Sequence, residues 1–176
     1  GQYEEIDTNK TIEETAKELI GKQIVAKVTL DHYRWPRKKT DILPGHFAIV
    51  VFDLVSLVKG EIPENFKIND GYSLTVTGNT MPLLNKKARY VLTGTLKLDQ
   101  RYGLQYVVDE IHLDYDLTRE EDQRTFFSFF MSADRIDQLF DQIKDPLRAL
   151  QTKDLGELQK VKGVGPFMAL KMCQKF

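Results

Sequence analysis

The 176-residue sequence predicts an α+β protein in which a small β-barrel precedes a compact all-α region. Apolar residues alternate with polar ones over much of the stretch from Lys22 to Leu113, and this two-residue period is typical of half-buried strands. After Asp116 the apolar residues recur at helical intervals, in segments that are all short. The change of period places the boundary between the two parts at about residue 116.

The first segment, residues 1–21, is acidic and predicts an N-terminal helix. Thr11-Ile12-Glu13-Glu14 has the capping-box pattern, in which the threonine hydroxyl accepts a hydrogen bond from the backbone three residues later. Ala16 and Leu19 continue the apolar face at helical spacing, and Gly21 ends the run. We therefore expect a short amphipathic helix that leads into the sheet.

The second segment, residues 22–116, contains five predicted strands. Gly94 lies inside the fourth of them, where a glycine is typical of a bulge or of a close approach by another part of the chain. Five antiparallel strands leave two exposed edges unless the sheet curls, so a closed barrel is the economical arrangement. We predict a five-stranded OB-like β-barrel, with an SH3-like barrel and an open sheet as alternatives. The expected strands are 22–30, 46–57, 72–77, 89–98 and 104–113.

The third segment, residues 117–176, predicts a cluster of five short helices. Thr118-Arg119-Glu120-Glu121 repeats the capping-box pattern at the start of the first helix. The starts of the other four are marked by residues that favour the first positions of helices, namely Ser132, Asp145-Pro146, Asp154 and Pro166.

Composition excludes several classes of protein. Hydrophobic residues make up 41% and charged residues 29% of the chain, as in ordinary globular domains. The longest apolar run is interrupted by Asp53 and Ser56, and no charged-then-apolar leader opens the chain. We therefore expect no membrane segment and a cytoplasmic location. Because the first residue is glycine and the last helix has no stop signal, we also expect a piece of a longer protein.

The sequence contains no recognisable catalytic motif. It lacks the G-x-x-x-x-G-K-[ST] phosphate loop, the H-E-x-x-H metal motif and any C-x-x-C pair. One cysteine and three scattered histidines argue against a disulfide framework and a zinc site. We interpret the acidic residues near the fifth strand as its solvated face. The expected result is a chain with no catalytic residue, metal ligand or cofactor of its own.

The sharpest functional signal is the segment 155–175, which has the pattern of a helix-hairpin-helix. Gly163-Val164-Gly165 joins two short helices, and its glycines permit a positive φ and the close approach of another backbone. Pro166 starts the second helix, whose free N–H groups and positive dipole end can bind a phosphate oxygen without reading a base. The alternative is a plain αα-corner in which the glycines serve tight packing.

Charge is distributed unevenly along the chain, in a way that favours a nucleic-acid contact at this end. From Lys144 to Phe176 seven basic residues stand against three acidic ones, although the whole chain has a net charge of −1. Phe167 and Met168 occupy positions where such hairpins usually carry a cation and a small polar residue, so the phosphate contact is either weaker here or made by two nearby lysines. The DNA-binding residues predicted here are Lys162, Gly163, Val164, Gly165 and Lys171.

A second signal lies between the first two predicted strands. Four cationic side chains and two aromatic ones occupy the segment 32–39, where an OB barrel places a ligand-contacting loop. Aromatic faces stack unpaired bases while cations follow the backbone, so this mixture suits single-stranded nucleic acid. The alternative is a solvated loop with its tryptophan packed against the barrel. The predicted contacts are Arg34, Trp35, Arg37, Lys38 and Lys39.

A barrel followed by a helix-hairpin-helix resembles the N-terminal region of the long-form RecD/TraA-family DNA helicases. The resemblance covers about residues 22–176 and rests on Val76-Thr77-Gly78-Asn79, the run Tyr90 to Leu96, Arg101 to Tyr106 and the Gly163 to Pro166 hairpin. It implies a non-catalytic DNA-binding fragment of an ATP-dependent helicase that acts in DNA repair or recombination. Motor domains that bind ATP and Mg would then lie beyond Phe176.

The same resemblance implies single-stranded DNA, or a junction of single and double strands, as the partner. Members of the family usually carry two hairpins before the motor, and here the segment 126–140 stands in the first hairpin's place without its Gly-x-Gly. We therefore expect the first unit to be degenerate. Two other readings stay open: a RuvA-like junction-binding protein, and a docking module of a DNA-repair or recombination factor whose barrel binds another protein.

Overall fold

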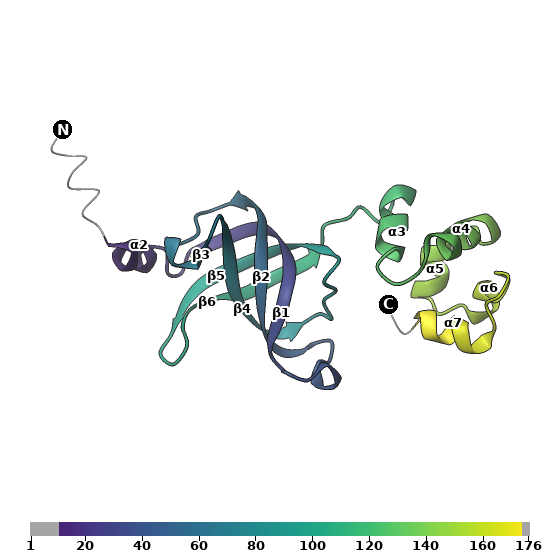
Figure 1. Cartoon of the computed structure of the whole chain (residues 1–176), viewed down its shortest axis with the longest axis horizontal. Helices are drawn as coiled ribbons and strands as arrows, with labels where there is room; N and C mark the ends of the chain where they lie inside the picture. Colours follow the sequence, from purple (N-terminus) through teal and green to yellow (C-terminus); the bar gives the residue numbers. More distant parts are fainter. Residues whose placement is uncertain (1–10, 174–176) are drawn as a thin grey trace. The chain divides into compact units, whose positions relative to one another are not determined.

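The computed structural model describes residues 11–173, which divide into two compact units. The barrel unit extends to Asp114, and the helical unit begins at Tyr115 (Figure 1). The expected helix at residues 1–21 lies partly outside the described residues. Within the described ranges, no helix combines the length and the apolar character needed to cross a bilayer.

The barrel unit is a closed ring of five strands with one short additional strand. The hydrogen-bonded order around the ring is β1-β2-β4-β6-β5 and back to β1, and β4 and β6 form its parallel pair. This arrangement confirms the predicted OB-like barrel and excludes the open sheet. The strands are β1 (Gln23–Trp35), β2 (His46–Lys59), β3 (Lys67–Ile68), β4 (Gly71–Met81), β5 (Arg89–Asp99) and β6 (Gly103–Leu113).

The alternation seen in the sequence produces the barrel core. In β1 every second side chain from Ile24 to Leu30 is buried, and the other strands contribute fully buried residues of the same kind. Gly94 confirms the expected bulge, because the β5–β6 register shifts there and an added Cβ would lie 3.3 Å from the carbonyl oxygen of Val107. The largest buried side chains of the barrel are Ile24, Phe52, Leu74, Met81, Leu92, Leu96 and Tyr106.

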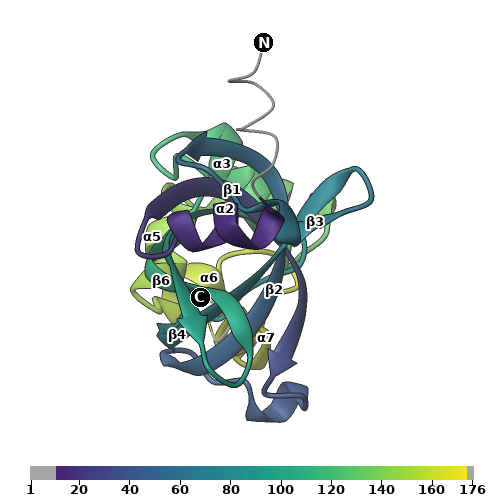
Figure 2. The ribbon, with the colours of Figure 1, turned by 90° about the vertical axis from the view of Figure 1, so that its left-hand side faces the viewer.

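A short helix, α2 (Ile12–Glu18), lies at one end of the barrel (Figures 1 and 2). The Thr11 hydroxyl accepts a hydrogen bond from the backbone N–H of Glu14 at 3.1 Å, as the capping pattern predicts. Ala16 and Leu19 are buried, and α2 packs against the short 3₁₀ helix η2 (Glu64–Phe66). The apolar face of the helix therefore covers an open end of the barrel.

The helical unit packs five short helices around one hydrophobic core. Ser132, Asp145 and Asp154 cap the helices that follow them, because each side chain accepts a hydrogen bond from a backbone N–H three residues later. The core includes Phe127, Leu139, Leu150, Leu158 and Ala169. The helices are α3 (Glu120–Phe127), α4 (Ala133–Gln142), α5 (Pro146–Gln151), α6 (Leu155–Leu158) and α7 (Pro166–Cys173).

Two local expectations were wrong, and one short strand was not predicted. Arg119, not Thr118, precedes α3, and the Thr118 hydroxyl donates to the Asp116 carboxylate at 2.5 Å. An acceptor two residues upstream competes with the capping position, since a threonine hydroxyl can bond to nearby groups in a turn. The first strand runs on to Trp35 instead of ending at Leu30, and the short strand β3 carries no alternation that would predict it.

Candidate nucleic-acid interface

The barrel carries an open groove between two protruding loops. One is the loop between β1 and β2, which contains the 3₁₀ helix η1 (Lys39–Asp41), and the other is the tight β5–β6 turn; both project from the lower side of the barrel (Figures 1 and 2). We call this hollow of about 850 Å³ the barrel groove. It is lined by Arg34, Trp35, Arg37, Phe47, Ile49, Thr77, Asp99, Tyr102 and Gln105.

Three aromatic side chains line the barrel groove and keep much of their surface exposed. Trp35 is 52%, Phe47 44% and Tyr102 61% exposed, although side chains of this size usually bury most of their area. Each comes from a different strand or turn, so the groove gathers them from positions far apart in the sequence. Exposed aromatic faces around a groove can stack on flat, unpaired bases.

The charge of the groove is mainly positive. Arg34 and Arg37 line it, and the guanidinium of Arg101 lies 6.0 Å from the centre of the Tyr102 ring. Asp99 is the one carboxylate in the lining, and its Oδ1 accepts hydrogen bonds from the backbone N–H groups of Arg101 and Tyr102 at 2.8 and 2.9 Å. That carboxylate therefore shapes the β5–β6 turn and presents Tyr102 to the groove.

One buried polar side chain lies in the groove lining. Gln105 on β6 is 8% exposed, and its amide makes no hydrogen bond to another described residue. The amide atoms are not among the fully buried polar atoms that lack a partner, so they keep some exposure and can bond to water or to a ligand. Gln105 is therefore placed to bond to the edge of a molecule held in the groove.

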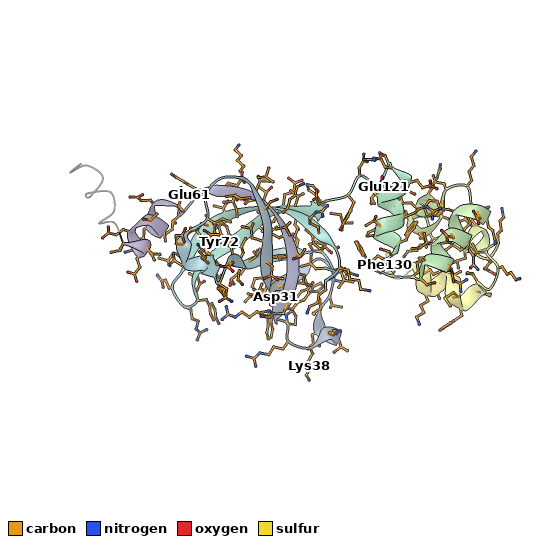
Figure 3. The ribbon with its side chains drawn as sticks, turned by 45° about the horizontal axis from the view of Figure 1, so that its top comes forward. Asp31, Lys38, Glu61, Tyr72, Glu121 and Phe130 are labelled. Atoms are coloured by element: carbon orange, nitrogen blue, oxygen red, sulfur yellow. The ribbon has the colours of Figure 1, made fainter. Side chains whose placement is uncertain are left out.

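The structure separates the residues predicted in the basic segment. Arg34 and Trp35 belong to β1, with Trp35 paired to Ile49, and they line the groove together with Arg37. Lys39 begins η1 and lines a different pocket, while Lys38 lines neither and sits on the protruding loop after β1 (Figure 3). The residues that the sequence predicts as one basic loop therefore do not form a single site.

Sequence reasoning missed Phe47, Tyr102 and Gln105. Phe47 reads as part of an apolar strand, and nothing in the local pattern of Gln105 marks it as buried. Tyr102 was detectable, because an aromatic residue inside the turn Asp99 to Gly103 has no core to enter. Closure of the barrel, which brings β2, β6 and the β5–β6 turn to one face, is what assembles the site.

The predicted hairpin joins α6 to α7 in the helical unit, and its two glycines differ. Gly163 has a φ of 84°, the left-handed region that favours glycine. Gly165 has no such φ, and an added Cβ there would meet nothing within 4 Å. Val164 is buried between them, so the hairpin is anchored at its centre and open on either side.

Helix α4 holds the hairpin through the backbone carbonyl and the backbone N–H of Lys162. The guanidinium of Arg135 donates to the carbonyl oxygen of Lys162 at 3.2 Å, and the N–H of Lys162 donates to the Gln142 side chain at 3.0 Å. An added Cβ at Gly163 would lie 3.5 Å from Arg135 Nη1, so this arginine is adjacent to the turn. Arg135 therefore supplies a cation at the hairpin that the sequence did not reveal.

Lys171 also lies near Arg135. The two side chains line a pocket of about 210 Å³ together with Met168 and Met172 of α7. The first N–H group of α7 with a backbone partner is that of Ala169, which donates to the Gly165 carbonyl at 2.9 Å. The preceding N–H groups at the start of α7 are left for a ligand or solvent.

The segment in place of a first hairpin is filled with aromatic side chains. Phe126 contacts Phe130 with ring centres 5.3 Å apart, and Phe127 contacts Phe140 at 5.7 Å. The turn between α3 and α4 holds no glycine, and three of its five residues are Phe129, Phe130 and Met131. This part of the helical unit supports the second hairpin rather than offering a second open turn.

No cluster of three or more histidine, cysteine or carboxylate side chains suited to a metal ion occurs within residues 11–173. Comparison with known proteins found no family model that matches the chain and no curated protein similar to it.

Proposed function

We propose that this chain is a nucleic-acid-binding region that holds a single strand in the barrel groove and a phosphate backbone at the Gly163–Gly165 hairpin. The observation that carries the proposal is the set of side chains that line the barrel groove. OB-fold proteins bind oligonucleotides on the face of their second and third strands, between the loops that follow their first and fourth strands. In this barrel those elements are β2, β4 and the two loops that flank the groove.

The groove offers the three kinds of contact that a single strand needs. Trp35, Phe47 and Tyr102 provide faces for stacking, which does not depend on base identity. Arg34 and Arg37 provide charge for phosphates, and Gln105 provides a donor and an acceptor for a base edge or a sugar hydroxyl. The combination supports binding of unpaired nucleic acid with little sequence preference.

The hairpin supports a second, backbone-directed contact. Its exposed turn, the free N–H groups at the start of α7 and the cations Lys162, Arg135 and Lys171 together suit a phosphate oxygen. None of these groups is arranged to read a base. A duplex or a strand junction presents such phosphates in a regular array.

The resemblance to RecD/TraA-family helicases supports a larger setting for this activity. In that setting the chain delivers DNA to a cytoplasmic motor that acts in repair or recombination. ATP and Mg would be bound by the motor, outside this chain, and the residues present here would guide the strand.

The groove is tested by fluorescence anisotropy with a labelled single strand. Trp35→Ala and Tyr102→Ala should each weaken binding by about 1–3 kcal/mol, or roughly fivefold to 150-fold, because each removes one stacking face. Ile68→Ala is the matched control, since Ile68 is an exposed side chain of the same unit outside the groove. Wild-type affinity in both aromatic variants, with the circular dichroism spectrum unchanged, would refute the groove as the binding site.

A second candidate function, protein docking through the barrel, is favoured by one observation. Pairing of β2 with β4 ends at Asp53, while β2 itself runs on to Lys59 and exposes Val55 and Val58. An exposed apolar strand edge can accept an added strand from another protein. Absence of any single-strand binding by the wild-type chain would favour this candidate over the groove.

A further inference from the structure

A second hollow lies next to the barrel groove, on the other side of the β1–β2 loop. It has a volume of about 590 Å³, and we call it the Tyr33 pocket. Its walls come from the second half of β1, from the loop that contains η1 and from the connection between β4 and β5. The residues that matter to its chemistry are Tyr33, Arg37, Lys39, Leu83, Asn85 and Lys86.

The walls of the Tyr33 pocket are held by hydrogen bonds rather than left as loose loops. The N–H of Leu84 donates to the Tyr33 hydroxyl at 3.2 Å, and the N–H of Asn85 donates to the Tyr90 hydroxyl at 2.8 Å. These two bonds fix the β4–β5 connection against the barrel. The wall of the pocket formed by this connection is therefore held in a fixed position.

The charge of the pocket is positive. Arg37, Lys39 and Lys86 line it, no carboxylate does, and no described carboxylate forms an ion pair with these three residues. His32 also lines the pocket, but its Nδ1 lies 2.5 Å from the Asp31 carboxylate, which balances any charge on the ring. Three unpaired cations around a partly apolar floor suit a phosphate group attached to a flat or apolar body.

Arg37 lines both the barrel groove and the Tyr33 pocket, so the two hollows meet at this side chain. The β1–β2 register shifts between Tyr33 and Trp35, and such a bulge redirects neighbouring side chains. That shift explains how two residues only two positions apart in one strand line different hollows. A chain leaving the groove beside Trp35 would pass Arg37 and reach Tyr33.

We infer that the Tyr33 pocket continues the barrel groove, so that one single strand occupies both and its phosphates pass from Arg37 to Lys39 and Lys86. This inference rests on the proposed function of the groove. It adds a second subsite and predicts that the barrel binds a longer stretch of nucleic acid than the groove alone can hold. Site sizes of OB folds range from about 4 to 16 nucleotides, which leaves room for both.

The test compares a short and a long single strand, of about 4 and about 12 nucleotides, on the full chain. Binding is followed through the fluorescence of Trp35, the chain's single tryptophan, at several salt concentrations. The double variant Lys39→Gln/Lys86→Gln removes two phosphate contacts. For the long strand, the negative slope of log K against log salt should become less steep by about 1.4, at roughly 0.7 per phosphate, and the slope for the short strand should stay unchanged.

A matched double variant, Lys59→Gln/Lys67→Gln, removes two exposed lysines of the same unit that line neither hollow, and it should leave both slopes unchanged. Equal slopes for the long strand in wild type and the Lys39/Lys86 variant would overturn the inference while leaving the groove intact. An equal loss for both strand lengths would also overturn it, because the pocket would then act only through its general field. Failure of the wild-type chain to bind either strand would overturn the proposed function itself.

Discussion

The substitution Gln105→Leu tests whether the Gln105 amide serves ligand binding or the stability of the barrel. The side chains have similar size, so the substitution removes the amide while preserving the packing of β6. In the folded chain that amide bonds to no other described residue, so no protein hydrogen bond is lost. We therefore expect the free energy of unfolding to stay equal or to rise by up to about 1 kcal/mol.

Affinity should move in the opposite direction. If the amide bonds to a base edge or a sugar hydroxyl, its loss leaves that group of the ligand unpaired and should cost about 1–3 kcal/mol, or roughly fivefold to 150-fold in Kd. Anisotropy with a labelled single strand measures the Kd, and urea unfolding followed by circular dichroism measures stability. A variant that becomes more stable while it binds more weakly would show that Gln105 faces the ligand.

Gln23→Leu is the matched control. Gln23 lies on β1, and its amide donates to the Asp109 carboxylate at 3.0 Å, so the same substitution there removes a hydrogen bond to a charged group. It should lower stability and leave single-strand affinity unchanged. A loss of stability in Gln105→Leu with unchanged affinity would refute the reasoning, because the glutamine would then be structural.

Three further predictions concern stability and the hairpin. Gly163→Ala should destabilise the helical unit by about 1–2 kcal/mol, because the φ of 84° at this position is unfavourable for alanine. Gly165→Ala should leave stability unchanged and weaken duplex binding by about tenfold or more. Equal stabilities of the two variants in urea unfolding would contradict this difference. Tyr106→Phe should leave the barrel as stable or more stable, by up to about 2 kcal/mol, because the buried hydroxyl has no partner among the described residues; a lower midpoint in thermal unfolding would reveal one. Asp114→Asn should destabilise the barrel at pH 7, and the difference should shrink as pH falls below the ordinary carboxyl pKa and through the lowered folded-state value, which unfolding curves across pH would check.

The sign of the pH effect follows from the surroundings of Asp114. Burial alone would raise the pKa of this carboxyl, but the hydrogen bond from Arg89 at 2.6 Å and the charges of Lys27 and Arg89 outweigh it and lower the pKa. A lowered pKa in the folded state means that the ionised group stabilises the fold above the ordinary carboxyl pKa and loses this effect as pH falls through the folded-state value. Stability that rose on acidification would contradict the assignment.

The sequence alone determined the five long strands and the short helices, and where most of the helices begin, but not the short strand β3. Alternation from Ile24 to Leu30 predicts β1 because one face of a strand must be apolar to enter a core. The caps at Thr11, Ser132 and Asp154 were equally visible, since an N-cap depends only on the few residues that follow it. Both signals act over short distances along the chain.

The tertiary structure alone decided which side chains share a site. Trp35, Phe47 and Gln105 come together because the ring of strands closes, and no local pattern encodes that closure. The same holds at the hairpin, where Arg135 reaches Lys162 from a helix far away in the sequence. The different roles of Gly163 and Gly165 were also decided by the tertiary structure, since the sequence shows only that both glycines are present. The folded backbone alone gives Gly163 a positive φ and leaves Gly165 open, because φ depends on the path that packing imposes on the turn.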